Sequence, residues 1–171
     1  MLNQPIKSLS MEKTSVAPNQ LADRELIISR DFEISRNLLF EAWTDPVHLD
    51  NWWGPENFQT STDKFDLRNG GSWHLTMNSP YGEFSNVIQY DEIVSPEQIR
   101  YTLPGGLQTI VLFTAIGNNS NLLMRLIFES AAELHNAIDN YGALKSGNQT
   151  LDRLTIYLAE KHGKQIDTQL V

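Results

Sequence analysis

The sequence contains no cysteine, and basic residues are few. The absence of cysteine excludes disulfide bonds, a thiolate nucleophile and cysteine-ligated zinc. The chain has 13 lysines and arginines against 21 aspartates and glutamates, which leaves a formal net charge of -8. Because such a surface repels phosphate backbones and anionic headgroups, we expect neither nucleic acid nor a membrane surface as a partner.

The chain also has no apolar run long enough to span a membrane, and its first twenty residues lack the apolar core of a signal peptide. We therefore expect a cytoplasmic protein. The 40% content of apolar residues is enough for one domain with its own core. Composition predicts a disordered or loosely attached tail at 1–22, a single domain at 23–161 and a frayed C-terminus at 162–171.

Motifs for catalysis and for metal binding are missing as well. The four histidines form no HExxH or other metal-ligand pair, and no nucleophile elbow is present. Gly70-Gly71 and Gly105-Gly106 are predicted to form hairpin turns rather than phosphate loops, because neither pair follows a strand and opens a helix. We therefore expect no metal, no cofactor and no assigned catalytic residue.

Tryptophan, by contrast, is concentrated in one segment. Three of the four tryptophans lie between Trp43 and Trp53, among Asp-Pro and Gly-Pro breaks. Ser35 is predicted to cap a short helix, and Asp45 a second one with Pro46 at its first position. Since indoles bury a large apolar area, the segment predicts short helices pinned at one end of a sheet or cavity.

The middle of the chain has the pattern of an antiparallel sheet. From Phe58 to Phe128, five turn signals at roughly ten-residue spacing separate six strands, and a further strand is predicted upstream from Leu26. Trp73, Leu75 and Met77 alternate with polar residues, which is typical of a sheet with one covered face.

A long C-terminal helix is predicted to cover that face. Ser130 and Glu133 form a capping box at its start. Apolar residues then recur in steps of three and four from Leu134 to Leu158, which predicts one continuous helix. A strand, two short helices, a six-stranded meander and a long helix make up the α+β helix-grip order.

Four segments resemble the ordered motifs of the SRPBCC (START-like) superfamily, in the branch named after the activator of the heat-shock chaperone ATPase. They are residues 25–36, 42–55, 66–73 and 148–154, and the resemblance runs from about Arg24 to Glu160. It implies a Bet v 1-like sheet of about seven strands that grips the C-terminal helix. Members of this family include chaperone activators, ligand carriers and resistance proteins, so the resemblance is compatible with several functions.

We expect a ligand cavity between the sheet and the helix. Its predicted wall comprises Trp73, Leu75, Met77, Tyr90, Val111 and Phe113 from the strands, and Tyr141, Leu144, Gly147, Asn148 and Leu151 from the helix. The alternative for each is an ordinary core position. Asn148 needs a partner because burying an unpaired amide costs about 1–3 kcal/mol. The family motif usually has Gly-Trp where this chain has Ser146-Gly147, and the missing indole either enlarges the cavity or is replaced by a neighbour.

Three functions compete at this stage. The first is binding of a small hydrophobic or aromatic molecule for carriage, sensing or sequestration. The second is regulation of a protein partner, although the eukaryotic chaperone activator has a second, N-terminal domain that this chain lacks. The third is an enzyme of the cyclase, dehydratase or hydrolase kind using His74, Asn148 or Tyr90, but alternation places His74 on the outer face. A homodimer through a sheet edge or the Trp52-Trp53 corner is compatible with each of them.

Overall fold

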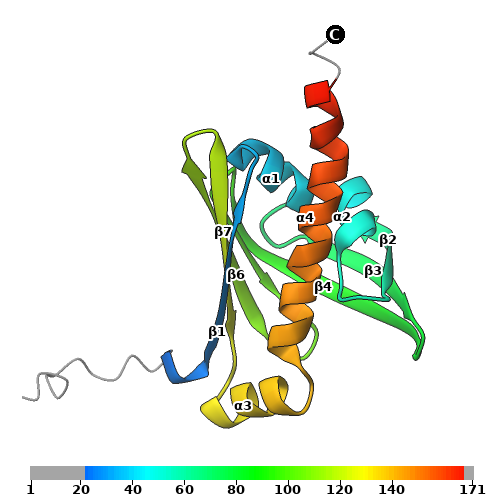
Figure 1. Cartoon of the computed structure of the whole chain (residues 1–171). Helices are drawn as coiled ribbons and strands as arrows, with labels where there is room; N and C mark the ends of the chain where they lie inside the picture. Colours follow the sequence, from blue (N-terminus) through cyan, green and yellow to red (C-terminus); the bar gives the residue numbers. More distant parts are fainter. Residues whose placement is uncertain (1–21, 168–171) are drawn as a thin grey trace, which may run out of the picture.

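The computed structural model describes residues 22–167 and has the predicted α+β helix-grip architecture (Figure 1). In chain order the elements are η2 (Ala22–Arg24), β1 (Glu25–Phe32), α1 (Arg36–Thr44), α2 (Pro46–Trp52), β2 (Gln59–Phe65), β3 (Ser72–Ser79), β4 (Gly82–Val94), β5 (Gln98–Thr102), β6 (Gln108–Ile116), β7 (Asn119–Ile127), α3 (Ala131–Asp139) and α4 (Ala143–Asp167). The predicted tail lies outside the described residues apart from Ala22. Helix α4 continues to Asp167, beyond the domain boundary predicted at residue 161.

All seven strands belong to one antiparallel sheet in the order β1-β7-β6-β5-β4-β3-β2. Strands β2 to β7 form the predicted six-stranded meander, and β1 pairs with β7, with Ile28 opposite Met124. Figure 1 shows α4 crossing one face of the sheet, with α1 and α2 beside its upper half and α3 at the lower end. The sheet therefore has one face covered by helices, as the alternation in β3 predicts.

Local capping residues start three of the helices where the sequence predicts. The Leu38 amide donates to Ser35 Oγ at 3.4 Å, and the Val47 amide donates to Asp45 Oδ1 at 2.8 Å. At α3 the Glu133 amide donates to Ser130 Oγ at 3.1 Å. These bonds satisfy amides that have no partner inside the helix, so the start of each helix is encoded locally.

The C-terminal segment differs from the prediction of one continuous helix. It breaks between α3 and α4, where Gly142 adopts the left-handed region with φ +63°. Glycine occupies this conformation without the penalty of a Cβ atom, so it readily ends a helix. The apolar periodicity spans the break because both helices bury a stripe of the same spacing.

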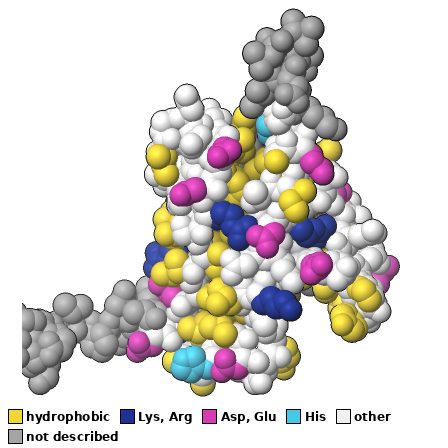
Figure 2. All heavy atoms as spheres, viewed as in Figure 1, with side chains coloured by type: hydrophobic (Ala, Val, Ile, Leu, Met, Phe, Trp, Pro, Cys, Tyr) yellow, Lys and Arg dark blue, Asp and Glu magenta, His cyan; other side chains and the backbone are white. Residues whose placement is uncertain are grey.

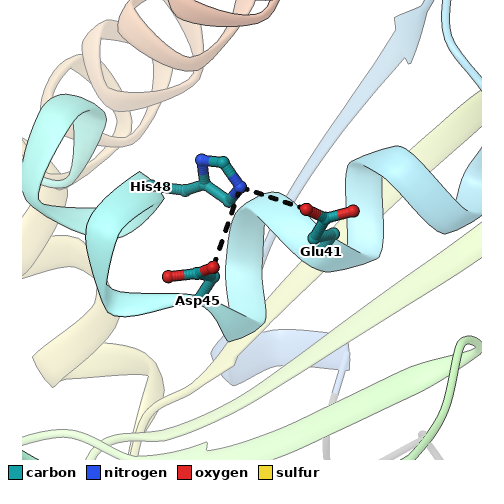
Figure 3. A group of neighbouring side chains, drawn as sticks. All are labelled: Glu41, Asp45 and His48. Atoms are coloured by element: carbon teal, nitrogen blue, oxygen red, sulfur yellow. Dashed lines mark hydrogen bonds and ion pairs between the residues drawn. The ribbon is translucent and has the colours of Figure 1, made fainter.

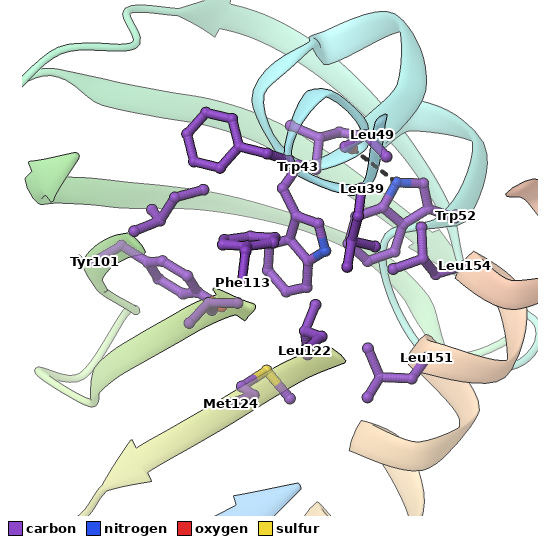
Figure 4. Close-up of a cluster of buried hydrophobic side chains, with 14 of the residues drawn as sticks. Leu39, Trp43, Leu49, Trp52, Tyr101, Phe113, Leu122, Met124, Leu151 and Leu154 are labelled. Atoms are coloured by element: carbon purple, nitrogen blue, oxygen red, sulfur yellow. Dashed lines mark hydrogen bonds between the residues drawn. The ribbon is translucent and has the colours of Figure 1, made fainter. Parts of the chain in front are cut away.

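The core lies where the tryptophan segment meets the sheet and α4 (Figure 4). Trp52 is completely buried, and its Nε1 donates to the Ala42 carbonyl at 3.0 Å. The Trp43 ring lies 4.9 Å from the Trp52 ring and 6.0 Å from the Phe113 ring, centroid to centroid. These contacts confirm that the segment forms short helices pinned at one end of the sheet. In the part of the chain that the structure describes, no helix has the length and apolar character needed to cross a membrane.

Gly147 allows α4 to pack closely on β1. A Cβ atom at this position would lie 2.4 Å from Ile28 Cδ1 and 4.0 Å from Met124 Cε. A neighbouring side chain, Ile28, therefore takes the space of the missing indole. No enlarged cavity opens at this glycine.

We expect Gly147→Ala to destabilise the protein, although alanine in a helix interior is favoured over glycine by about 1 kcal/mol. The reason is the overlap with Ile28, and Ile28→Val removes the overlapping methyl group. In the Ile28→Val background the same Gly147→Ala change should therefore stabilise by about 1 kcal/mol. Urea unfolding of the four proteins in the double-mutant cycle measures this coupling.

Gly163→Ala serves as the control, since nothing lies within 4 Å of a Cβ atom at that position of α4. Gly163→Ala should stabilise the folded protein by up to about 1 kcal/mol, whether or not Ile28 is changed. Additive effects of Ile28→Val and Gly147→Ala would contradict the close packing described above.

Candidate functional site

An apolar pocket of about 300 Å³ lies beside Trp53, at the end of α2. Strands β3 and β4 and the connection from β5 to β6 form the rest of its wall. The lining residues are Trp53, Leu75, Met77, Asn86, Ile88, Leu103, Pro104 and Leu107. Of these described lining residues, Asn86 has a polar amide side chain.

Register explains why these strand residues face the same hollow. Leu75 pairs with Asn86 across the β3–β4 ladder, so their side chains lie on one face of the sheet. Met77 and Ile88 lie two residues further along their strands and therefore share that face. Helix α4 packs mainly on β1, α2 and α3, which leaves this part of β3 and β4 less covered.

A second cavity lies deeper, under α1 and α2, and is almost filled. Its volume is about 10 Å³, at the limit of what a single water molecule requires. Trp53 and Ile88 line both this cavity and the outer pocket, while Tyr90 and Tyr101 line only the inner one. Burial raises the pKa of both tyrosines, so their hydroxyls stay protonated well above the usual range.

The eleven residues predicted for the cavity wall fall into separate places. Leu75 and Met77 line the outer pocket, and Trp73 and Tyr90 line the inner cavity. The others pack in the core (Val111, Phe113 and Leu151), lie against Ile28 (Gly147), bond to β1 (Asn148) or are exposed (Tyr141 and Leu144). Tyr141 is 77% exposed because it lies in the turn between α3 and α4 instead of on a continuous helix.

Asn148 has partners within the protein. Its Nδ2 donates to the Leu144 carbonyl at 3.0 Å, and its Oδ1 accepts from Arg30 Nη2 at 3.4 Å. Arg30 also pairs with Asp152 at 2.5 Å. On the face that carries α4, basic and acidic side chains lie next to one another (Figure 2). The Asn148 amide thus takes part in a polar link between α4 and β1, away from the apolar pocket.

Several pocket residues were missed by the sequence analysis. Asn86 and Ile88 precede Tyr90 at two-residue steps, so strand alternation from that predicted residue could have identified both. Leu103, Pro104 and Leu107 lie around a turn whose Gly105-Gly106 signal predicts only a chain reversal. Nothing local indicates that this turn closes over β4.

His48 forms a polar cluster with Glu41 and Asp45 (Figure 3). The histidine is buried, its Nε2 lies 3.3 Å from Glu41 and 4.0 Å from Asp45, and its Nδ1 lies 2.6 Å from the Tyr157 hydroxyl. Glu41, Asp45 and His48 are spaced i, i+4 and i+7 across two short helices, and this spacing could have indicated the cluster from the sequence. Burial, followed by the charges of Asp45 and Glu41, raises the pKa of Tyr157.

The ligand atoms of Glu41, Asp45 and His48 lie within 4.8 Å of one another, as in a metal-binding group. However, Lys161 Nζ lies 3.2 Å from His48 Nδ1, and an ammonium group this close opposes a second cation. The contacts with Tyr157 and Lys161 join α4 to α1 and α2. We therefore interpret the cluster as a clamp between helices.

Comparison with known proteins supports the architecture. The family model described as Activator of Hsp90 ATPase homolog 1-like protein matches residues 33–159. No curated protein matches the sequence. Among solved structures, a protein from Nitrosomonas europaea is similar with a TM-score of 0.76 at 16% identity, over 83% of this chain and 98% of that chain. A Mycobacterium smegmatis protein has a TM-score of 0.75 at 18% identity, over 83% and 95% of the two chains.

The AHSA1 protein from Silicibacter pomeroyi is also similar, with a TM-score of 0.66 at 19% identity, over 81% of this chain and 99% of that chain. At these identities the structural likeness shows a shared fold. The family match covers most of the chain and confirms the resemblance drawn from the sequence motifs.

We expect Tyr157→Phe to lower the free energy of unfolding by about 1 kcal/mol, because it removes the hydroxyl that bonds to His48. Urea unfolding at neutral pH measures the change. Tyr81→Phe is the matched control, since Tyr81 is 88% exposed. Loss of its hydroxyl should change the free energy of unfolding by less than about 0.5 kcal/mol. Equal stability of Tyr157→Phe and the wild type would show that the clamp contributes nothing.

Stability should also fall in alkaline solution. Above pH 10 the unfolded chain releases the Tyr90 proton while the folded protein keeps it. The free energy of unfolding therefore falls by about 1.4 kcal/mol for each further pH unit because of this group. Tyr90→Phe should remove that contribution and flatten the loss between about pH 10 and 11, measured by urea unfolding at each pH. A slope unchanged by Tyr90→Phe would contradict the burial of this hydroxyl.

Proposed function

This chain belongs to the Activator of Hsp90 ATPase homolog 1-like family, and we propose that it binds a small hydrophobic molecule in the pocket beside Trp53. The observation that carries the proposal is an open apolar hollow next to an inner cavity that is almost completely filled. Ligand sites in proteins are concave, mostly apolar and contain a few polar groups that orient the ligand. Asn86 is such a group in this pocket.

The size of the pocket favours a small ligand. Its volume of about 300 Å³ is at the lower end of the range for ligand sites, roughly 300–1,000 Å³. The indole of Trp53 offers a flat apolar surface, and the chain beyond it turns sharply at Gly54, whose φ is +101°. We infer that an aromatic or compact aliphatic molecule would bury its surface against Trp53, Met77 and Leu107, which are partly exposed.

The chemistry of the wall favours binding over catalysis. None of the described residues that line the pocket is titratable, so the wall supplies no group for proton transfer. His74, considered for such a role, lies on the opposite face of β3 from Leu75, with its Nε2 3.1 Å from Ser72 Oγ. A role as regulator of a protein partner would use the outer surface and would leave this pocket without a purpose.

We expect Asn86→Trp to fill the pocket and to weaken the binding of N-phenyl-1-naphthylamine, an uncharged aromatic probe, by at least about tenfold. Val87→Trp is the matched control, because the neighbouring position points to the opposite face of β4 and is already 38% exposed. Fluorescence titration gives the Kd of each protein. Native mass spectrometry of freshly purified protein should also detect a retained small molecule that Asn86→Trp loses.

Two results would contradict the proposal. One is a wild-type protein that binds no probe and carries no retained molecule. The other is equal weakening by Asn86→Trp and Val87→Trp, because this would place the probe outside the pocket.

A further inference from the structure

Arg153 has hydrogen-bonding capacity that the fold does not use. Its Nη1 donates to the carbonyls of Trp53, Gly54 and Pro55 at 3.2, 2.9 and 3.2 Å. A guanidinium group has five N–H donors, of which Nη1 provides two. Among the described residues, Nε and Nη2 have no hydrogen-bond partner, and no carboxylate lies within 4.0 Å of this arginine.

The acidic residues next to Arg153 bond elsewhere. Asp152, adjacent in the sequence, pairs with Arg30 at 2.5 Å. Glu56 accepts from Gln149 Nε2 at 3.3 Å. Arg153 is half-buried, and burial lowers its pKa because its charge is partly removed from water. Because no described carboxylate neutralises its positive charge, the position favours a bound anion.

The arginine lines a polar cleft of about 530 Å³. Its other described lining residues are Asn57, Phe58, Gln59, Asn78, Ser79 and Pro80, so among residues 22–167 Arg153 is the only charged one in this wall. Amide and hydroxyl groups can donate hydrogen bonds to an acidic group beside the guanidinium. The cleft therefore has the charge and the donors that recognise one acidic group.

This cleft adjoins the apolar pocket. Trp53 provides a carbonyl to Arg153 and a ring to the pocket. A Cβ atom placed on Gly54 would lie 2.7 Å from Met77 Cε, which lines the pocket, and 3.6 Å from Arg153 Nη1. Met77 Cε and Arg153 Nη1 thus lie on either side of one position next to Gly54, which places the polar cleft beside the apolar pocket.

We propose that the ligand is an amphipathic acid, with its apolar part beside Trp53 and its single acidic group on Arg153. This inference rests on the proposed function and adds the chemical class of the ligand. One unpaired cation matches one negative charge, and the net charge of -8 opposes more highly charged anions. Glycine at position 54 lets Met77 and Arg153 lie close to the same stretch of backbone, because a side chain there would collide with Met77.

The test compares two fluorescent probes that differ by one acidic group. They are 1-anilinonaphthalene-8-sulfonate, which is an anion, and N-phenyl-1-naphthylamine, which has the same rings without the sulfonate. Arg153→Gln should weaken binding of the anion by at least about tenfold and change binding of the neutral probe by less than about threefold. Arg153→Lys, which keeps the charge, should lie between the wild type and Arg153→Gln for the anion.

Arg100→Gln is the matched control for loss of one positive charge. Arg100 pairs with Glu92 at 3.6 Å and lies between Ile99 and Tyr101, whose side chains are buried, so it points away from the site. It should leave the affinity for both probes at the wild-type value. Circular dichroism checks that the variants are folded, because Arg153 also holds the carbonyls at the end of α2.

The outcomes separate the two proposals. Equal binding of the anion by wild type and a folded Arg153→Gln would overturn the amphipathic acid and leave pocket binding intact, provided that Asn86→Trp still weakens the neutral probe. Absence of binding of both probes to the wild type would overturn both proposals. If Arg153→Gln does not fold, the affinities of the wild-type protein for the two probes are compared instead. Weaker binding of the anion than of the neutral probe would contradict an anion site.

Discussion

The structure depends on the burial of Trp52 between the short helices and the sheet. Its indole is completely buried and bonds to the Ala42 carbonyl, which fixes α2 against α1. With α2 fixed, the next residue, Trp53, lies over β3 and β4, and its ring packs 5.0 Å from the ring of Trp73. The inner cavity and the outer pocket share Trp53, so the packing of this one corner determines the volume of both.

Helix α4 secures the same corner from the other side. Arg153 donates to the carbonyls of Trp53, Gly54 and Pro55, which follow the end of α2. Asp152 precedes Arg153 in the same helix. In the structure the two neighbours act separately, because successive helical residues point in different directions and Asp152 therefore reaches Arg30 on β1. The close contact of Gly147 with Ile28 holds α4 near that edge of the sheet.

Fold and site differ in how far the sequence predicts them. Ser35, Asp45 and Ser130 act on amides two or three residues away, so the starts of three helices could be located from local chemistry. The break at Gly142 could not, because the apolar spacing continues across it. Leu75 and Met77, which alternation placed on the covered face, line the outer pocket, whereas the contribution of Leu107 depends on how the β5–β6 turn closes on β4.

The sequence by itself determined the order of the elements, the apolar face of the sheet and the family, because these follow from short-range periodicity, capping and motifs. Only the tertiary structure decided which part of that face remains open. Val111 and Leu151 are apolar like Met77 but are enclosed in the core, whereas Met77 is only partly buried and lines the outer pocket. The difference arises because coverage by α1, α2 and α4 depends on contacts between residues far apart in the chain, which no local pattern records.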